Sequence, residues 1–97
     1  MKKYIEYKVL GKNNLPVTFE DFKNISESVK AIFNETDRVH LGEGLRTTFG
    51  VNGEQFHLIY GYMGPSLIIP NTHYGEKIKK TIKDLDNKLE FRRVQCQ

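Results

Sequence analysis

The dipeptide Asn52-Gly53 constrains the fold more than any other feature of the sequence, because it joins two runs of alternating apolar and polar residues. The runs cover Leu45–Val51 and Glu54–Tyr60, and Asn-Gly is the preferred pair for the two-residue type I′ turn of a β-hairpin. A turn of this type sets the register of its strands, so Phe49 is predicted to face Phe56. Turn chemistry and both alternations therefore predict one antiparallel hairpin with its phenylalanines on a single side.

Two amphipathic helices are predicted, one before and one after this hairpin. The first covers residues 18–34, where Thr18 is a suitable N-cap and apolar residues recur at spacings of three and four. We expect it to end at Asn34–Asp37, which are poor helix formers. The second covers about residues 73–89, with Thr72 as its N-cap.

Strands are predicted on either side of these helices. Residues 3–10 alternate like a half-buried strand, Arg38–Leu41 and Leu67–Ile69 are short extended candidates, and Phe91–Gln97 offers one more strand. We therefore predict a single α+β domain over residues 1–97. Its expected order is ferredoxin-like, βαββα(β), an antiparallel sheet with two helices on one face and the other face open to solvent.

Composition limits the function classes. The chain has 97 residues and 15 Lys+Arg against 12 Asp+Glu, a mild net charge of +3 that argues against both a nucleic-acid-coating tail and an acidic mimic of DNA. Its apolar runs are shorter than the roughly 18–20 residues of a membrane span. Cys96 is the single cysteine, which excludes an internal disulfide and a cysteine-rich zinc module. We expect a soluble, cytoplasmic protein that does not bind membranes.

Motifs for catalysis are lacking in the sequence. It contains no nucleophile motif, no phosphate-binding loop and no carboxylate pair at a catalytic spacing. Its histidines, His40, His57 and His73, have no second metal ligand at the spacings that metal sites use. We predict a non-enzymatic protein with no catalytic residues, metal or cofactor; the alternative is an enzyme that uses His57 as a general base.

The open face of the predicted sheet is the first candidate for a binding surface. Tyr4 and Lys8 from the first strand and Arg46, Thr48 and His57 from the hairpin are expected to lie there. Cations beside a stacking ring favour single-stranded RNA on a sheet of this kind. The phenylalanine of the 54–60 strand is predicted to face the core, however, so nucleic acid is the second interpretation.

The segment 61–70 is the second candidate surface, because it is apolar and rich in turn-forming residues. Gly64-Pro65 is interpreted as a turn, and Tyr62 and Leu67 as anchors that insert into a pocket of a partner. The alternative for this segment is a short buried strand.

Together these patterns favour a small binding module that acts on a protein partner, as inhibitors, immunity proteins and accessory factors do. The alternative is a module that binds RNA or single-stranded nucleic acid through the open sheet face. A homo-oligomer is the third arrangement that the sequence leaves open.

Overall fold

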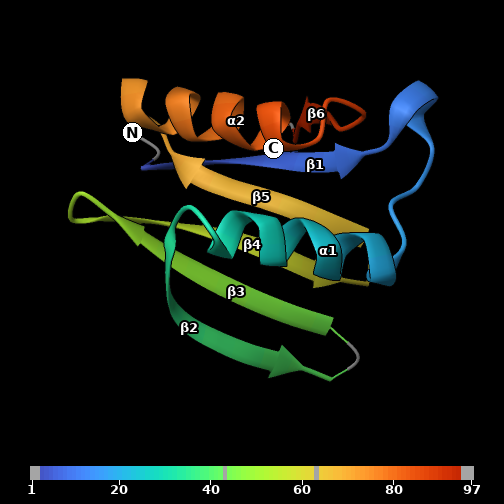
Figure 1. Cartoon of the computed structure of the whole chain (residues 1–97), viewed down its shortest axis with the longest axis horizontal. Coiled ribbons are helices and arrows are strands. Elements are labelled where there is room, and N and C mark those ends of the chain that lie inside the picture. Colours follow the sequence, from blue (N-terminus) through green and yellow to red (C-terminus); the bar gives the residue numbers. More distant parts are fainter. Residues whose placement is uncertain (1–2, 43, 63, 95–97) are drawn as a thin grey trace.

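The protein is an α+β domain in a computed structural model that describes residues 3–42, 44–62 and 64–94. Strands and helices alternate along the chain with four consecutive strands in the middle (Figure 1). The elements are β1 (Tyr4–Leu10), the short 3-10 turn η1 (Lys12–Asn14), α1 (Phe19–Lys30), β2 (Asn34–Leu41), β3 (Gly44–Val51), β4 (Glu54–Gly61), β5 (Gly64–Pro70), α2 (His73–Leu85) and β6 (Glu90–Arg93).

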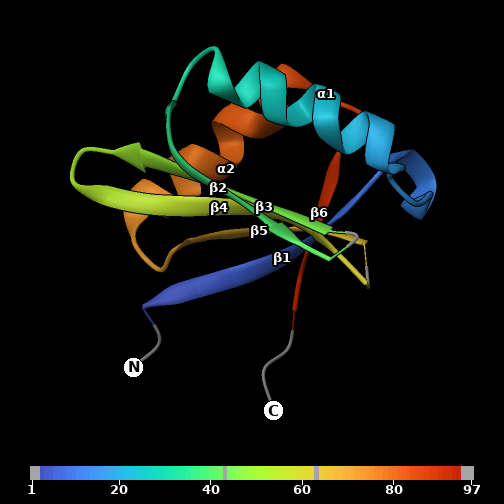
Figure 2. The same cartoon turned by 90° about the horizontal axis from the view of Figure 1, so that it is seen from below.

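The described strands form one six-stranded antiparallel sheet in the order β2-β3-β4-β5-β1-β6. Consecutive hairpins build β2 to β5, while β1 lies between β5 and β6. Figure 2 shows α1 and α2 on the same side of this sheet. The α+β class is therefore confirmed, but the ferredoxin-like order is wrong, because α2 follows the fifth strand instead of the third.

The two strands that the predicted order omits explain this error. β2 begins at Asn34, in the residues expected to close the first helix, and its first half is polar because β2 is an edge strand. A β-bulge between Glu35 and Asp37 also interrupts its alternation. β5 extends the Leu67–Ile69 candidate in both directions, and Gly64 pairs with Gly61, so Gly64-Pro65 is strand and not turn.

The β3–β4 hairpin has the predicted register. Phe49 lies opposite Phe56, with ring centroids 5.1 Å apart and planes within 20° of parallel. Asn52 and Gly53 have φ values of 48° and 79°, the positive values that a type I′ turn requires. The hairpin prediction is confirmed in turn, register and buried side.

Both helices begin at the predicted caps and end earlier than predicted. Thr18 Oγ1 accepts from Asp21 N–H at 3.1 Å, and Thr72 Oγ1 accepts from Gly75 N–H at 3.2 Å. α1 ends at Lys30, so Ile32 lies outside the helix and is 54% exposed.

Neither helix has the length and apolar character that crossing a membrane requires, among the residues described.

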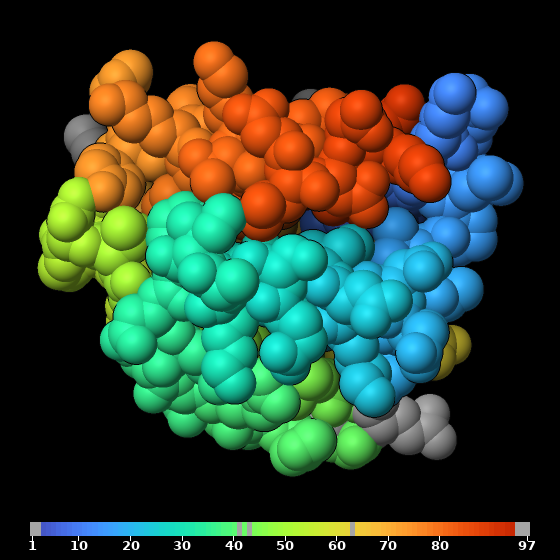
Figure 3. All heavy atoms as spheres, viewed as in Figure 1, coloured from blue at the N-terminus to red at the C-terminus, as the bar shows by residue number. Residues whose placement is uncertain are grey.

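The core lies between the two helices and the sheet face beneath them. α1 contributes Phe22 and Val29, and α2 contributes Ile78 and Ile82, all at most 2% exposed. Burial of each such side chain stabilises the fold by about 1.5–3 kcal/mol. The side chains of the two helices meet over the sheet and cover most of this face (Figure 3).

The last predicted strand is present in shortened form. β6 pairs antiparallel with β1, and Val94 N–H donates to Glu6 C=O at 2.9 Å just beyond its end. Residues 95–97, with Cys96 among them, lie outside the described part of the chain.

Candidate functional site

The sheet surface opposite the helices is the candidate site, and we call it the open face. Cross-strand partners share a face of the sheet, so the registers give its membership directly. The open face includes Tyr4, Glu6, Lys8 and Leu10 on β1, Asp37 and Val39 on β2, Arg46 and Thr48 on β3, Gln55, His57 and Ile59 on β4, Ser66, Ile68 and Pro70 on β5, and Glu90 and Arg92 on β6.

Five predicted site residues come together on this face: Tyr4, Lys8, Arg46, Thr48 and His57. Tyr4 is 43% exposed, and Lys8, Arg46 and His57 are partly exposed, so all four are accessible. Thr48 is only 4% exposed and therefore supports its neighbours instead of touching a partner.

His57 is held in place by the residues around it. Its Nδ1 lies 2.8 Å from Thr48 Oγ1, a hydrogen bond between direct cross-strand partners. The Tyr4 ring lies 6.2 Å from the His57 ring, centroid to centroid. Burial, aided by the positive charge of Arg46, lowers the pKa of His57 below its ordinary value. Both effects favour the neutral form of the ring.

Arg46 is incompletely satisfied by its surroundings. Its Nη2 lies 3.9 Å from Asp37 Oδ2, at the outer limit of an ion pair. Its Nε is buried and has no hydrogen-bond acceptor among the described residues. The Arg46 side chain is nevertheless 39% exposed, so a carboxylate from outside the chain can accept a charge-assisted hydrogen bond from its outer Nη groups.

Lys8 and Arg92 form a second positive site on the same face. They are direct cross-strand partners on β1 and β6. Arg92 Nη2 donates to Asn14 Oδ1 at 3.0 Å, and neither cation has an ion pair within 4.0 Å in the described ranges. Like charges directly opposite each other are destabilising, so this pair favours an anionic neighbour.

Apolar side chains occupy the middle of the open face. Ile59 and Ile68 lie on the two central strands and are partly exposed. Ile68, Ser66, Asp37 and Arg92 were missed by the sequence analysis, because β2, β5 and β6 were left out or incomplete. The glycines at positions 61 and 64 close the β4–β5 hairpin and are the signal that would have placed Ile68 beside His57.

The alternative surface at 61–70 divides into two parts. Leu67 is fully buried in β5, so the buried-strand interpretation of this segment is confirmed and the placement of Leu67 on a docking loop is wrong. Tyr62 lies in the β4–β5 turn and is fully exposed, whereas its neighbour Met63 lies outside the described residues. Leu67 therefore cannot serve beside Tyr62 as a second apolar anchor for a partner.

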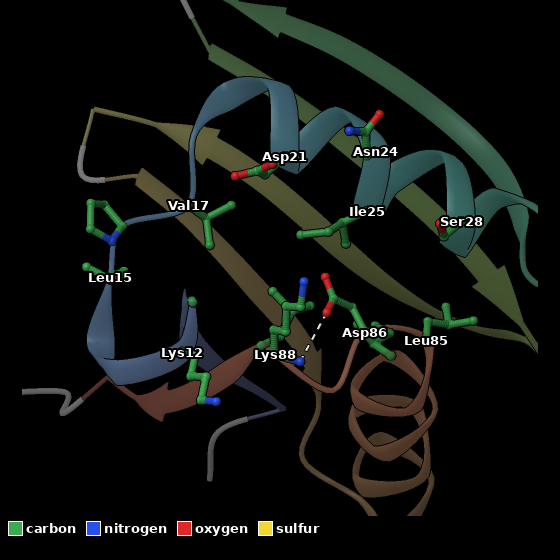
Figure 4. A pocket seen from close by; sticks show the side chains of 14 residues that line it. Lys12, Leu15, Val17, Asp21, Asn24, Ile25, Ser28, Leu85, Asp86 and Lys88 are labelled. Atoms are coloured by element: carbon green, nitrogen blue, oxygen red, sulfur yellow. Dashed lines mark hydrogen bonds between the residues drawn. The ribbon is translucent and has the colours of Figure 1, made fainter.

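A groove of about 480 Å³ lies on the helix side, at the end where η1 meets the two helices (Figure 4). Its lining includes the apolar residues Val17, Ile25 and Leu85 and the carboxylates of Asp21 and Asp86. Asp86 accepts from Lys88 N–H at 3.0 Å, and Asp21 lies in the first turn of α1, where a negative charge suits the helix dipole. The open face gathers five of the predicted site residues, so it is the stronger candidate.

Comparison with known proteins does not assign the chain. No family model, no curated protein and no solved structure matches it. Among the described residues, no group of three or more His, Cys, Asp or Glu side chains is arranged to hold a metal ion.

Proposed function

We propose that the chain is a small non-enzymatic binding module of the cytoplasm that occupies a protein partner through its open face, in the manner of an inhibitor, immunity or accessory protein. The observation that carries this proposal is the partly exposed guanidinium of Arg46, which is 3.9 Å from Asp37, beside the accessible apolar residues Ile59 and Ile68. An apolar centre next to an arginine is typical of protein interfaces.

The charge pattern favours a protein over nucleic acid. Asp37 and Glu6 lie on the same face as the cations, and they would repel a continuous phosphate backbone. The ring pair of Tyr4 and His57 supports the alternative, binding of RNA or single-stranded nucleic acid, because aromatic rings stack on bases.

A binding role also agrees with the burial of Thr48. This residue and His57 form a nucleophile–imidazole pair, but Thr48 is only 4% exposed. A substrate carbonyl has to reach the hydroxyl oxygen for nucleophilic catalysis, and burial prevents that approach.

Site-specific photocrosslinking tests the proposal. A benzophenone amino acid replaces exposed Gln55 on the open face, and a matched variant carries it at exposed Lys80 on α2. In extract from the source cells, we expect a discrete protein adduct from position 55 that survives nuclease treatment, and none from position 80. The adduct should disappear when Ile59→Ser is added to a variant that still folds by circular dichroism.

Two outcomes contradict the proposal. An adduct that nuclease removes assigns the open face to nucleic acid. Equal adducts from positions 55 and 80 show that the open face has no special affinity for proteins.

A further inference from the structure

One row of side chains crosses the open face at right angles to the strands. Arg46, Ile59, Ser66 and Lys8 are successive cross-strand partners on β3, β4, β5 and β1, and Arg92 continues the row on β6. The row has a cation toward each end and Ile59 and Ser66 between them. Neighbouring strands are about 4.8 Å apart, so the backbone positions of Arg46 and Lys8 are separated by roughly 14 Å.

This spacing matches an extended polypeptide. Residues i and i+4 of an extended chain point to the same side and lie about 13.6 Å apart, with residue i+2 midway on that side. From this match we infer that the open face binds an extended acidic segment of a partner protein, with carboxylates at i and i+4 and an apolar side chain at i+2. The inference rests on the proposed function and specifies its partner.

Each of the three side chains of such a segment would contact a particular group on the open face. The carboxylate at one end accepts from the outer Nη groups of Arg46, whose side chain is 39% exposed and whose ion pair with Asp37 is at the 3.9 Å limit. The carboxylate at the other end lies at Lys8 and Arg92 and reduces the repulsion between these paired cations. The apolar side chain at i+2 covers Ile59, which is partly exposed.

The neighbouring row sets the alignment of the segment. Asp37, Thr48, His57, Ile68 and Glu6 are the successive partners of that row, with an acid at each end. A segment displaced by one row would place one carboxylate at Thr48, next to Asp37, and the other at Glu6, and both would be repelled. The acids therefore restrict the segment to the cationic row and disfavour a strand of phosphates.

Synthetic peptides test the inference on the full chain. The probe is a fluorescent peptide with the core Glu-Ser-Leu-Ser-Glu, and binding is measured by anisotropy at low salt. One control has the core Gln-Ser-Leu-Ser-Gln, and the other has the same composition with adjacent acids, Glu-Glu-Ser-Leu-Ser. We expect the probe to bind at least about tenfold more tightly than either control, the loss typical of a charge-assisted hydrogen bond.

Protein variants assign the contact to the row. Arg46→Gln and Lys8→Gln should each weaken binding of the probe roughly tenfold. Lys80→Gln removes the same charge from the exposed side of α2 and should leave the affinity unchanged. Equal affinity for all three peptides, or an equal loss in Lys80→Gln, overturns the inference.

Two further measurements separate the inference from the proposed function. A dimer seen by sedimentation and abolished by Arg46→Gln, or tighter binding of oligo(dT) than of the probe, assigns the row to another occupant. Peptides that fail to bind while the position-55 adduct persists overturn the acidic segment and leave the protein-binding function standing. Loss of both overturns both.

Discussion

The backbone of Gly75 lies so close to the carbonyl oxygen of Pro70 that a Cβ atom at position 75 would come within 1.9 Å of it. Gly75 is in the first turn of α2, and Pro70 is the last residue of β5. The close contact therefore fixes how α2 packs against the sheet at the point where the chain leaves it. Only the absence of a side chain permits this approach.

Gly75→Ala should consequently destabilise the protein by about 1–3 kcal/mol, because the added methyl group forces α2 away from β5. Urea denaturation measures the loss. Gly61→Ala is the matched control, since a Cβ there meets no atom within 4 Å. Similar midpoints for the two variants would show that α2 has room to move without cost.

Gly53→Val should destabilise by about 1 kcal/mol or more, because a β-branched residue resists the φ of 79° at this turn position. Gly53→Asn should lose less, since asparagine tolerates positive φ better than other side chains. An unchanged denaturation midpoint in Gly53→Val contradicts the type I′ assignment.

The two sides of β4 should differ in their response to truncation. Phe56 is fully buried against Phe49 and Phe33, so Phe56→Ala should cost roughly 3–5 kcal/mol. His57 is on the open face, and His57→Ala should cost less than about 1 kcal/mol. Comparable losses, measured by chemical denaturation, would mean that both faces of the sheet are covered.

The stability of the protein should fall as the pH drops through the histidine range. The pKa of His57 is lower in the folded state than in the unfolded chain, mainly through burial and then through Arg46. The unfolded state therefore takes up a proton first as the pH falls below about 6.5, and stability is lost from there down to the folded-state pKa. The charged groups on the His57 side of the sheet include Arg46 in the neighbouring row, Asp37 beyond Thr48 and Glu6 beyond Ile68.

Urea denaturation at a series of pH values between about 7 and 5 checks this dependence. His57→Gln should flatten the decline, because it removes the group whose pKa differs between the two states. A decline of the same steepness in His57→Gln would assign the effect to other groups.

Local signals made part of the fold predictable. The Asn52-Gly53 turn sets the register of β3 against β4, because a two-residue turn leaves no alternative pairing. Thr18 and Thr72 were recognisable as caps because their hydroxyl groups satisfy N–H groups within three residues. Both kinds of signal act over a few residues and need no knowledge of the rest of the chain.

Features that depend on distant neighbours were not predictable in the same way. β2 carries polar residues on both sides near Asn34, so the sequence there shows no strand pattern. The segment is a strand because it pairs with β3. The row from Arg46 to Arg92 likewise depends on β1 lying between β5 and β6. Arg46, His57, Tyr4 and Lys8 were found from alternation, whereas Arg92 and Ile68 required the sheet order.

The position of β1 has a consequence for the order of folding. Tyr4 pairs with Pro70, so the pairing of β1 with β5 joins residues that are far apart in the sequence. The strands β2 to β5, by contrast, pair through adjacent hairpins. Non-local pairing is slow because loop closure costs entropy before any contact is made. We expect the hairpins to form in the transition state and β1 to dock after it.

Leu58→Ala in β4 should then slow refolding, and Val9→Ala in β1 should chiefly accelerate unfolding, as stopped-flow chevrons would distinguish. A slowed refolding limb in Val9→Ala would place the first strand in the nucleus instead.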